Sequence, residues 1–335
     1  MQETTKSKIR GILLIFFFVY IFAWGISGCD VGKAQAEEVK KINLSGKTFK
    51  LDKDIADGYP KFKFCCNFDD DRLTPDYAFK IITANDGPVR LGNNSIKFEL
   101  RVGDCGTSPG GYDDCSYNSE RHELNNIDGH ELKGVTWHTA SFFLDKDLPI
   151  HKNGVSLFNH MSILQFHSDG DGAPGWNFSV DTNGLELQRR TACNISKKDY
   201  KKILGKKKPK RCSVSNKGNN YEVVIHPNDL LGQWVDVVFN VKWTTKQTGY
   251  MKMWINGKLV YHYIGSTKTP REREGFQFGL YREVNDNTPN EATSIAYYDE
   301  LRYAKKHCKK LNLEDLGYSC IELENQSIRK IDKIK

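Results

Sequence analysis

The chain has 335 residues, of which 39% are hydrophobic and 12% aromatic, and a formal net charge of +7 at pH 7. This length allows one large domain or two ordinary ones, because all-β sandwiches often exceed about 200 residues as one domain. The positive charge is local, since nine basic residues fall between Lys197 and Arg211. The composition therefore excludes a generally basic protein and does not favour nucleic acid as a partner.

The N-terminus has the pattern of an export signal. A basic segment over 6–10 precedes an apolar run over 11–24, and the run ends at Ile26-Ser-Gly-Cys29, which resembles a bacterial lipobox. We expect a signal peptide over 1–28, a lipid on Cys29 that anchors the chain to a membrane, a tether over 29–45 and a place in the bacterial cell envelope. A plain signal peptide on a secreted protein, or an uncleaved anchor helix, is the alternative.

Eight further cysteines follow Cys29, and an even number in an exported chain indicates disulfides. The absence of a C-x-x-C pair argues against a zinc site. Cys65 and Cys66 are not expected to pair with each other. Pairing of nearest neighbours predicts the bonds Cys105–Cys115, Cys193–Cys212 and Cys308–Cys320.

Short segments that alternate apolar and polar residues, separated by turn signals, run from about residue 48 to residue 303. Asn183-Gly184 and Asn256-Gly257 are hairpin signals between such segments. Many short strands at this spacing predict an all-β sandwich or jelly roll.

Helical periodicity is limited to a turn or two near 199–204 and 314–316. We expect the β domain over 46–305 and a C-terminal tail over 306–335, held in part by Cys308–Cys320.

The basic loop over 197–211 lies between Cys193 and Cys212. It is either a landing site for a polyanion such as a sulfated or uronate glycan, or a solvated insertion.

Three of the expected strands place polar side chains on one face, because residues i and i+2 of a strand point the same way. A guanidinium, an amide, an imidazole and a phenol gathered on one sheet face can bind a carboxylate and move a proton beside it. The residues are Arg121, Glu123 and Asn125 in the first strand, Gln165 and His167 in the second, and Tyr281 in the third.

Together, three segments resemble the signature strands of jelly-roll polysaccharide lyases. They are Arg121-His-Glu-Leu124, Gln165-Phe-His167 and Gly275-Phe-Gln-Phe-Gly-Leu-Tyr281. Residues 60–303 are most similar to the heparin lyase I and glucuronan lyase branch, and the motifs are similar to those of alginate lyases. The resemblance implies a concanavalin-like β-jelly-roll sandwich with a concave substrate groove. It also implies β-eliminative cleavage of a 1,4-linked uronic-acid polysaccharide, of glucuronan or heparin type, to 4,5-unsaturated products.

The same resemblance implies a role for each residue. Arg121 and Gln165 would hold the substrate carboxylate, and Glu123 would orient Arg121. Tyr281 would donate a proton to the leaving O4, and would also take the C5 proton when both lie on one side of the sugar. His167 would be the base when the C5 proton lies on the opposite side.

Two positions depart from the alginate lyase pattern. Asn125 stands where a second Arg is usual, and Gln277 stands where Lys is usual. Both changes weaken the positive field around the carboxylate, which argues against alginate. Asn125, Gln277 and Arg282 complete the expected substrate-binding set with Glu123.

Further candidates for sugar subsites are His122, Trp137, His138, His160 and Trp176. Of these, His122 is expected to face away from Arg121, and the two tryptophans are more typical of a core.

No organic or redox cofactor is expected. Asp69-Asp-Asp71 and Asp169-Gly-Asp171 offer oxygen ligands for a structural calcium ion, but they lack the EF-hand register, and turn chemistry explains Asp-Gly pairs equally well. We expect a monomer whose partner is an acidic polysaccharide.

Two other functions fit the same sandwich. One is a non-catalytic, lectin-like glycan binder, which would not need the Tyr–His pair. The other is a glycoside hydrolase, which requires two facing carboxylates, whereas Glu123 is the one obvious acid of the expected site.

Overall fold

The computed structural model describes residues 41–42, 44, 47–65, 74–108, 112–126, 131–152, 155–168, 174–189, 221–268 and 273–327. All of them belong to one structural unit, Val39–Lys335. Several predictions lie outside the described residues: the signal peptide and Cys29, most of the tether, the side chain of Cys65 and all of Cys66, the Cys193–Cys212 bond, the basic loop 197–211, the helical turn near 199–204, and the calcium ligands Asp69, Asp71, Asp169 and Asp171.

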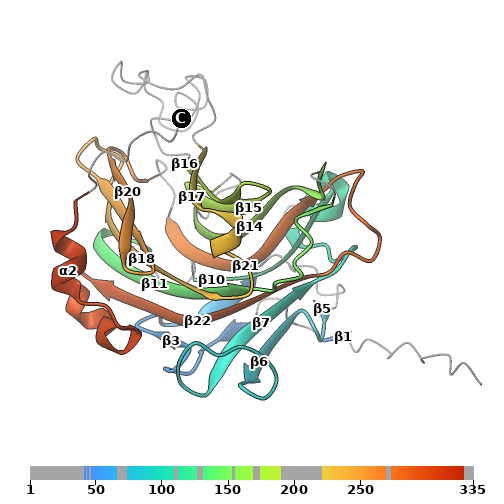
Figure 1. The fold of residues 1–335 in the computed structure, drawn as a ribbon, viewed down its shortest axis with the longest axis horizontal. Helices are drawn as coiled ribbons and strands as arrows, with labels where there is room; N and C mark the ends of the chain where they lie inside the picture. The colour runs from blue at the N-terminus through green and yellow to red at the C-terminus, as the bar shows by residue number, and fades with distance from the viewer. Residues whose placement is uncertain are drawn as a thin grey trace, which may run out of the picture. The chain divides into compact units, whose positions relative to one another are not determined.

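Eight antiparallel strands form one large sheet, the inner sheet (Figure 1). Across the sheet they follow the order β17 (Tyr221–Ile225), β16 (Gly184–Arg189), β15 (Trp176–Asp181), β14 (Phe158–Ser168), β21 (Glu274–Val284), β10 (Ser119–Asn125), β4 (Phe62–Cys65) and β2 (Thr48–Phe49).

A second eight-stranded sheet, the outer sheet, follows the order β20 (Lys258–Ile264), β19 (Tyr250–Ile255), β18 (Trp234–Trp243), β11 (Gly134–Leu144), β22 (Ser294–Lys305), β7 (Asn94–Leu100) and β6 (Phe79–Thr83). The short β3 (Ala56–Asp57) pairs in parallel with β22. Both sheets are curved, and the outer sheet lies against the convex side of the inner sheet (Figure 1).

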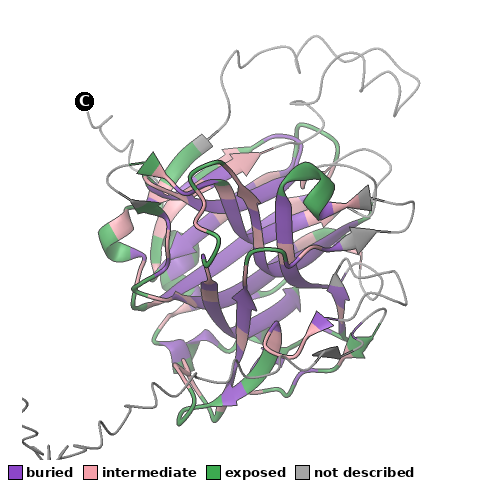
Figure 2. Ribbon diagram, turned by 90° about the vertical axis from the view of Figure 1, so that its right-hand side faces the viewer, coloured by how far each residue is buried: buried purple, intermediate pink, exposed green. Residues whose placement is uncertain are grey.

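The core lies between the two sheets and is largely aromatic. Phe166 of β14 and Phe239 of β18 are both 0% exposed, and their ring centroids lie 5.2 Å apart. Every second residue of a strand points into this layer, which is why the alternating segments of the sequence become strands. Figure 2 shows the buried strands at the centre and the exposed residues mainly in turns and at the periphery. The prediction of an all-β jelly-roll sandwich is confirmed.

Both predicted hairpins are present. Asn256 and Gly257, with φ of 47° and 77°, join β19 to β20, and a two-residue turn of this type needs positive φ at both positions. Gly184, with φ of 118°, closes the turn between β15 and β16.

The remaining strands form two-stranded sheets: β1 (Lys41–Ile42) with β5 (Thr74–Pro75), β8 (Thr107–Ser108) with β9 (Tyr112–Asp113), and β12 (His151–Lys152) with β13 (Val155–Ser156). The helical turns are η1 (Asp114–Tyr117), η3 (Pro227–Asp229), η4 (Cys308–Leu311), η5 (Leu313–Leu316) and the α-helix α2 (Cys320–Asn325). In the part of the chain that the structure describes, no helix has the length and apolar character needed to cross a membrane.

The segment after β22 packs on the outer sheet. Trp137 and Trp254 of that sheet stack at 5.6 Å, and Nε1 of Trp254 donates to the carbonyl oxygen of Leu323 at 3.1 Å. The predicted Cys308–Cys320 disulfide is present and holds this segment, with its Cα atoms 5.8 Å apart. The helical turn predicted near 314–316 lies within η5.

A β-bulge interrupts the ladder between β14 and β21. Ser162 pairs with Tyr281 and Leu164 pairs with Phe278, so two residues of β21 lie opposite one residue of β14. A bulge of this kind changes where the side chains on either side of it point.

Gly279 lies in this bulge with φ of 132°. A Cβ atom there would collide with the carbonyl oxygen of His122 and would lie 2.7 Å from Cα of Glu123. The hydroxyl of Tyr298, from the outer sheet, donates to the carbonyl oxygens of Gly279 and Ile163 at 2.7 and 3.0 Å. The bulge is therefore held from beneath by the other sheet.

Candidate active site

The face of the inner sheet that points away from the core, termed the polar face, carries the residues selected from the sequence. Cross-strand partners share a face, so the register decides which side chains lie together. The pairs on this face are Arg121 with Tyr281, Glu123 with Gly279, and Asn125 with Gln277 between β10 and β21, and Gln165 with Gln277 and His167 with Gly275 between β14 and β21.

Arg121 lies between a carboxylate and an aromatic ring. Its Nε and Nη2 donate to the two carboxylate oxygens of Asp114, each at 2.7 Å, and its Cζ lies 4.3 Å from the ring centroid of Tyr281. Burial alone would lower the pKa of Arg121, but Asp114 and Glu123 raise it above its usual value. Asp114 therefore orients Arg121. Glu123, to which the resemblance assigns that role, lies beside the same guanidinium, with its Oε2 3.7 Å from Nη1.

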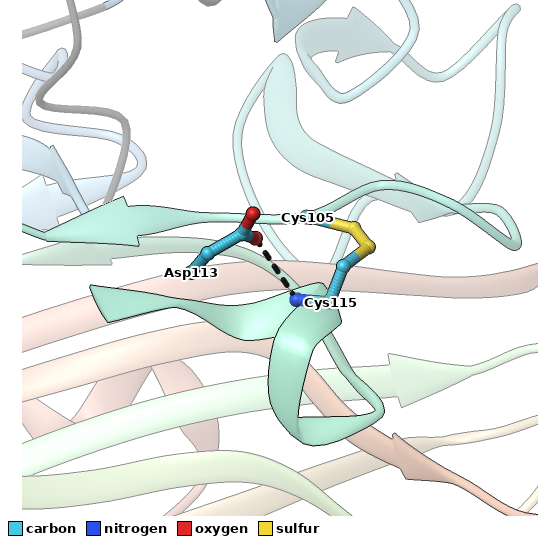
Figure 3. Close-up of side chains that lie close together, drawn as sticks. All are labelled: Cys105, Asp113 and Cys115. Atoms are coloured by element: carbon cyan, nitrogen blue, oxygen red, sulfur yellow. Dashed lines mark hydrogen bonds between the residues drawn. A yellow bond between two sulfur atoms is a disulfide. The ribbon is translucent and has the colours of Figure 1, made fainter. Parts of the chain in front are cut away.

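Asp114 is fully buried at the start of η1, next to a disulfide. The predicted bond between Cys105 and Cys115 is present, with Cα atoms 5.3 Å apart (Figure 3). The side chain of Asp113 accepts a hydrogen bond from the backbone N–H of Cys115 at 3.1 Å. Cys105, Asp113 and Cys115 lie close enough to hold a metal ion, but their sulfurs are joined, so no thiolate ligand is available.

Tyr281 is half-buried and has two polar neighbours besides Arg121. Its hydroxyl lies 3.0 Å from Oγ of Ser119, and its ring centroid lies 5.4 Å from that of His160. Nδ1 of His160 lies in turn 3.2 Å from Oε2 of Glu283. The sequence motifs did not include Ser119 or Glu283, because each lies at the end of a strand outside the recognised segments.

Glu123 is fully buried and joins two amides. It accepts hydrogen bonds from Nε2 of Gln165 and from Nε2 of Gln277, both at 2.7 Å. Gln165 reaches it across β21 above Gly279, where there is no side chain. Burial raises the pKa of Glu123 to about 7, against the lowering effects of Arg121 and of the two amides.

This pKa predicts a change of stability with pH. Glu123 binds its proton more tightly in the folded chain than in the unfolded chain, where its pKa has the ordinary value of 4.5. The contribution of this proton to the free energy of unfolding is therefore complete below about pH 4.5 and is lost as the pH rises through about 7. At about 1.36 kcal/mol per pKa unit, the loss is about 3 kcal/mol. Urea unfolding between these pH values should show this extra slope in the wild type and not in Glu123→Gln.

Burial also raises the pKa of Asp299 to about 7. Asp299 contributes equally to the pH dependence of stability in the wild type and in Glu123→Gln, so the difference between the two proteins is due to Glu123. Equal slopes in the wild type and in Glu123→Gln would show that Glu123 does not hold a proton in this range.

His167 lies on the polar face beyond Gln165, away from Tyr281. It pairs with Gly275, which precedes Tyr281 by six residues along β21, or roughly 20 Å of extended strand. Asn125 is buried beside Gln277. The structure thus brings Arg121, Glu123, Gln165, Gln277 and Tyr281 into one connected cluster, and His167 lies on the same face of the sheet.

Arg282 lies on the opposite face of β21, and the prediction that it binds substrate is wrong. It is fully buried, and its guanidinium donates to Glu120 at 2.6 Å, to Oγ of Ser294 at 2.9 Å and to the carbonyl oxygen of Ala292 at 3.0 Å. Since neighbours in a strand alternate faces, a Tyr281 on the polar face directs Arg282 inward.

Most of the further candidates lie in the interior. His122 faces away from Arg121, as expected, and lies 3.1 Å from Asp104. Trp137, His138 and Trp176 are at most 3% exposed, which agrees with a core role for the two tryptophans. Among these candidates His160 alone adjoins the cluster.

A family model described as "Polysaccharide lyase" matches residues 79–302. No curated protein matches the chain. Among solved structures, an endo-β-1,4-glucuronan lyase from the fungus Trichoderma reesei is similar, with 18% identity, 70% of this chain and 91% of that chain covered, and a TM-score of 0.46. Alginate lyase AlgAT5 of polysaccharide lyase family 7 has 15% identity, 76% and 98% coverage and a TM-score of 0.45. An alginate lyase from Pseudomonas aeruginosa has 17% identity, 63% and 83% coverage and a TM-score of 0.40.

Proposed function

The chain belongs to the polysaccharide lyase family, and from this premise we propose that it cleaves a 1,4-linked uronic-acid polysaccharide by β-elimination on the polar face. The observation that carries the proposal is the contact between the Arg121 guanidinium and the Tyr281 ring, with the Gln165 amide joined to them through Glu123. A cation, an amide and a phenol are the groups that this reaction needs.

The first task of the site is to hold the carboxylate of one sugar. Arg121 supplies a positive charge, and its two hydrogen bonds to Asp114 hold the guanidinium in place. Gln165 supplies an amide, and the hydrogen bond from its Nε2 to Glu123 fixes the orientation of that amide. Both contacts strengthen as negative charge spreads from C5 into the carboxylate, so they lower the free energy of the transition state more than that of the bound substrate.

The second task is proton transfer. The C5–H bond breaks as a base takes the proton, and its electron pair forms the C4=C5 double bond. The C4–O4 bond then breaks, and the departing O4 takes the phenolic proton of Tyr281. Ser119, with its Oγ 3.0 Å from the phenol oxygen, can orient that proton.

The described part of the polar face carries few positive charges. In the described part of this face the Lys and Arg side chains are those of Arg121 and Lys63, and amides stand at Asn125 and Gln277. A glucuronan-type chain carries one carboxylate per uronate and no sulfate, which fits the few cations in this described part of the face. We therefore name glucuronan as the first substrate to test, and heparin as the second because of the basic loop 197–211.

The test is incubation of the purified protein with glucuronan, heparin, heparan sulfate and alginate while the ultraviolet absorbance of the 4,5-unsaturated uronate is followed. We expect a rise with glucuronan above all. A folded protein that binds one of these chains and produces no rise with any of them would instead be a glycan-binding protein.

We also propose that the protein is exported and anchored through a lipid on Cys29. The disulfides Cys105–Cys115 and Cys308–Cys320 support an oxidising compartment. Membrane fractionation of the wild type and of Cys29→Ser tests this, because only the wild type should sediment with membranes.

A further inference from the structure

We propose that Asn177 of β15 and Gln188 of β16 form a subsite that binds hydroxyl groups of the sugar next to the one that is cleaved. This inference rests on the proposed lyase function and extends its site to two strands outside the recognised motifs.

A row of polar side chains crosses the inner sheet, one from each of six neighbouring strands. Each residue lies directly opposite the next one in the ladder, so all six point to the polar face. Neighbouring strands are about 4.8 Å apart, so the row is a track across the strands with one polar group at each step. In order across the sheet, its members are Lys63, Asn125, Gln277, Gln165, Asn177 and Gln188.

The amide of Asn177 differs from the two that precede it in the row. Gln165 and Gln277 both donate to Glu123 at 2.7 Å, so these two amides have a partner within the site. Asn177 is 5% exposed, and its Oδ1 accepts no hydrogen bond from any residue that the structure describes. A buried acceptor without a partner is uncommon in a folded protein, because it has lost its bonds to water and gained none. A donor from a bound ligand would supply the missing bond.

The charge around Asn177 and Gln188 suits a hydroxyl group better than a carboxylate. The described charged residues of the polar face on these two strands are acids, Asp181 and Glu186. Burial raises the pKa of Glu186, and so does the charge of Asp181. Arg189, the one Arg of β16, points to the opposite face, where it donates to the outer sheet. A hydroxyl can donate to Oδ1 of Asn177, whereas a carboxylate can only accept.

The described cations lie on the other side of the site. Lys63 is the first residue of the row, and Arg121 lies on β10, two strands from Gln165. A sugar chain that follows the row, with the carboxylate of the cleaved sugar at Arg121 and Gln165, therefore places the adjacent sugar over Asn177 and Gln188. Asn177 is the direct cross-strand partner of Gln165, so no other residue separates the two positions.

The experiment measures affinity and stability of the same variants. Calorimetric titration with a glucuronan oligosaccharide is done in the Tyr281→Phe background, where turnover does not consume the ligand, and thermal unfolding is followed without ligand. We expect Asn177→Leu to lower the affinity by about 3–10-fold, the effect of one lost hydrogen bond. Its Tm should stay the same or rise, because leucine has a similar shape and removes a buried acceptor that has no partner among the described residues. Gln188→Leu should lower the affinity by about threefold.

Asn240→Leu is the matched control. Asn240 lies on β18 of the outer sheet and is 6% exposed, but its Nδ2 donates to the carbonyl oxygen of Thr136 at 3.2 Å. The same change at this position should lower the Tm and leave the affinity for the oligosaccharide unchanged. If Asn177→Leu behaved like Asn240→Leu, Asn177 would be a structural amide, and the subsite would be overturned.

Two further readouts identify the kind of contact. With Tyr281 in place, Asn177→Leu should raise KM by the same factor and keep kcat within about twofold, because Asn177 touches no reacting atom. The ratio of the two affinities should be the same at low and high salt, since a contact between neutral groups is not screened. A ratio that shrinks as the salt concentration rises would mean that a carboxylate lies over Asn177, which would overturn the assignment of hydroxyl groups.

The outcomes separate the subsite from the lyase function. If the wild type cleaves a uronan and Asn177→Leu keeps both its affinity and its KM, the subsite fails and the lyase function stands. If the wild type produces no unsaturated product from any uronan, the lyase function fails, and the titrations decide on the subsite alone. A lower affinity of Asn177→Leu would then support the subsite, and an unchanged affinity, or no binding to either protein, would overturn it.

Discussion

Replacing Tyr281 with Phe is expected to abolish turnover and leave substrate binding largely intact. The change removes the hydroxyl group that forms a hydrogen bond with Ser119. It keeps the aromatic ring, which contacts Arg121 and His160. Without the phenolic proton, O4 would leave as an alkoxide, so we expect kcat to fall by about 10²–10⁴-fold. Initial rates of unsaturated product formation, together with calorimetric binding of a uronan oligosaccharide, measure the two effects.

The matched control is Tyr117→Phe. Tyr117 is 61% exposed in η1, close in sequence to Ser119, and loses the same hydroxyl. It should keep the activity of the wild type. If Tyr281→Phe turned over at a rate similar to Tyr117→Phe, another group would have to protonate the leaving oxygen.

The second large effect is expected for Arg121→Lys. Lysine keeps the positive charge near Asp114 but lacks the planar guanidinium group. That group forms two parallel hydrogen bonds to Asp114 and lies with its flat face over the ring of Tyr281. Loss of a donor that stabilises the developing negative charge costs about 10²–10³-fold in kcat. Steady-state kinetics test this, with thermal unfolding to verify that the variant folds.

Arg101→Lys is a close control, because Arg101 has similar contacts away from the polar face. Its Nε donates to Glu99 at 2.7 Å, and its Cζ lies 3.8 Å from the ring centroid of Tyr77. If both lysine variants lost the same small factor, Arg121 would be a structural residue, and the carboxylate would have to be bound elsewhere.

The fold could be read from the sequence because its signals are local. Alternation with a period of two marks the strands, and Asn256-Gly257 marks a hairpin through the φ values that those two residues accept. The disulfides Cys105–Cys115 and Cys308–Cys320 followed from nearest-neighbour spacing.

The site was only partly predictable, for reasons that differ between residues. Alternation alone should have excluded Arg282, since its neighbour Tyr281 lies on the polar face. Asp114 was not foreseen because it precedes its strand in a helical turn that only the folded loop brings to Arg121.

The neighbours of Tyr281 depend on strand register, which a sequence does not reveal where bulges intervene. The ladder between β14 and β21 shifts twice, once between Phe158 and His160 and once between Ser162 and Leu164. These shifts place His160 beside Tyr281 and leave His167 near Gly275. The motif order along the chain carries no information about either shift.

The bridge between Cys105 and Cys115 has a practical consequence for anyone who makes this protein. It closes the loop that carries Asp114, and Cys115 is exposed and therefore open to reductants. Recombinant material from the cytoplasm of an ordinary bacterial host would emerge with free thiols and a loosened Arg121, and would look like a weak catalyst. Expression into the periplasm, or oxidative refolding followed by a thiol assay, should come before any specific activity is recorded.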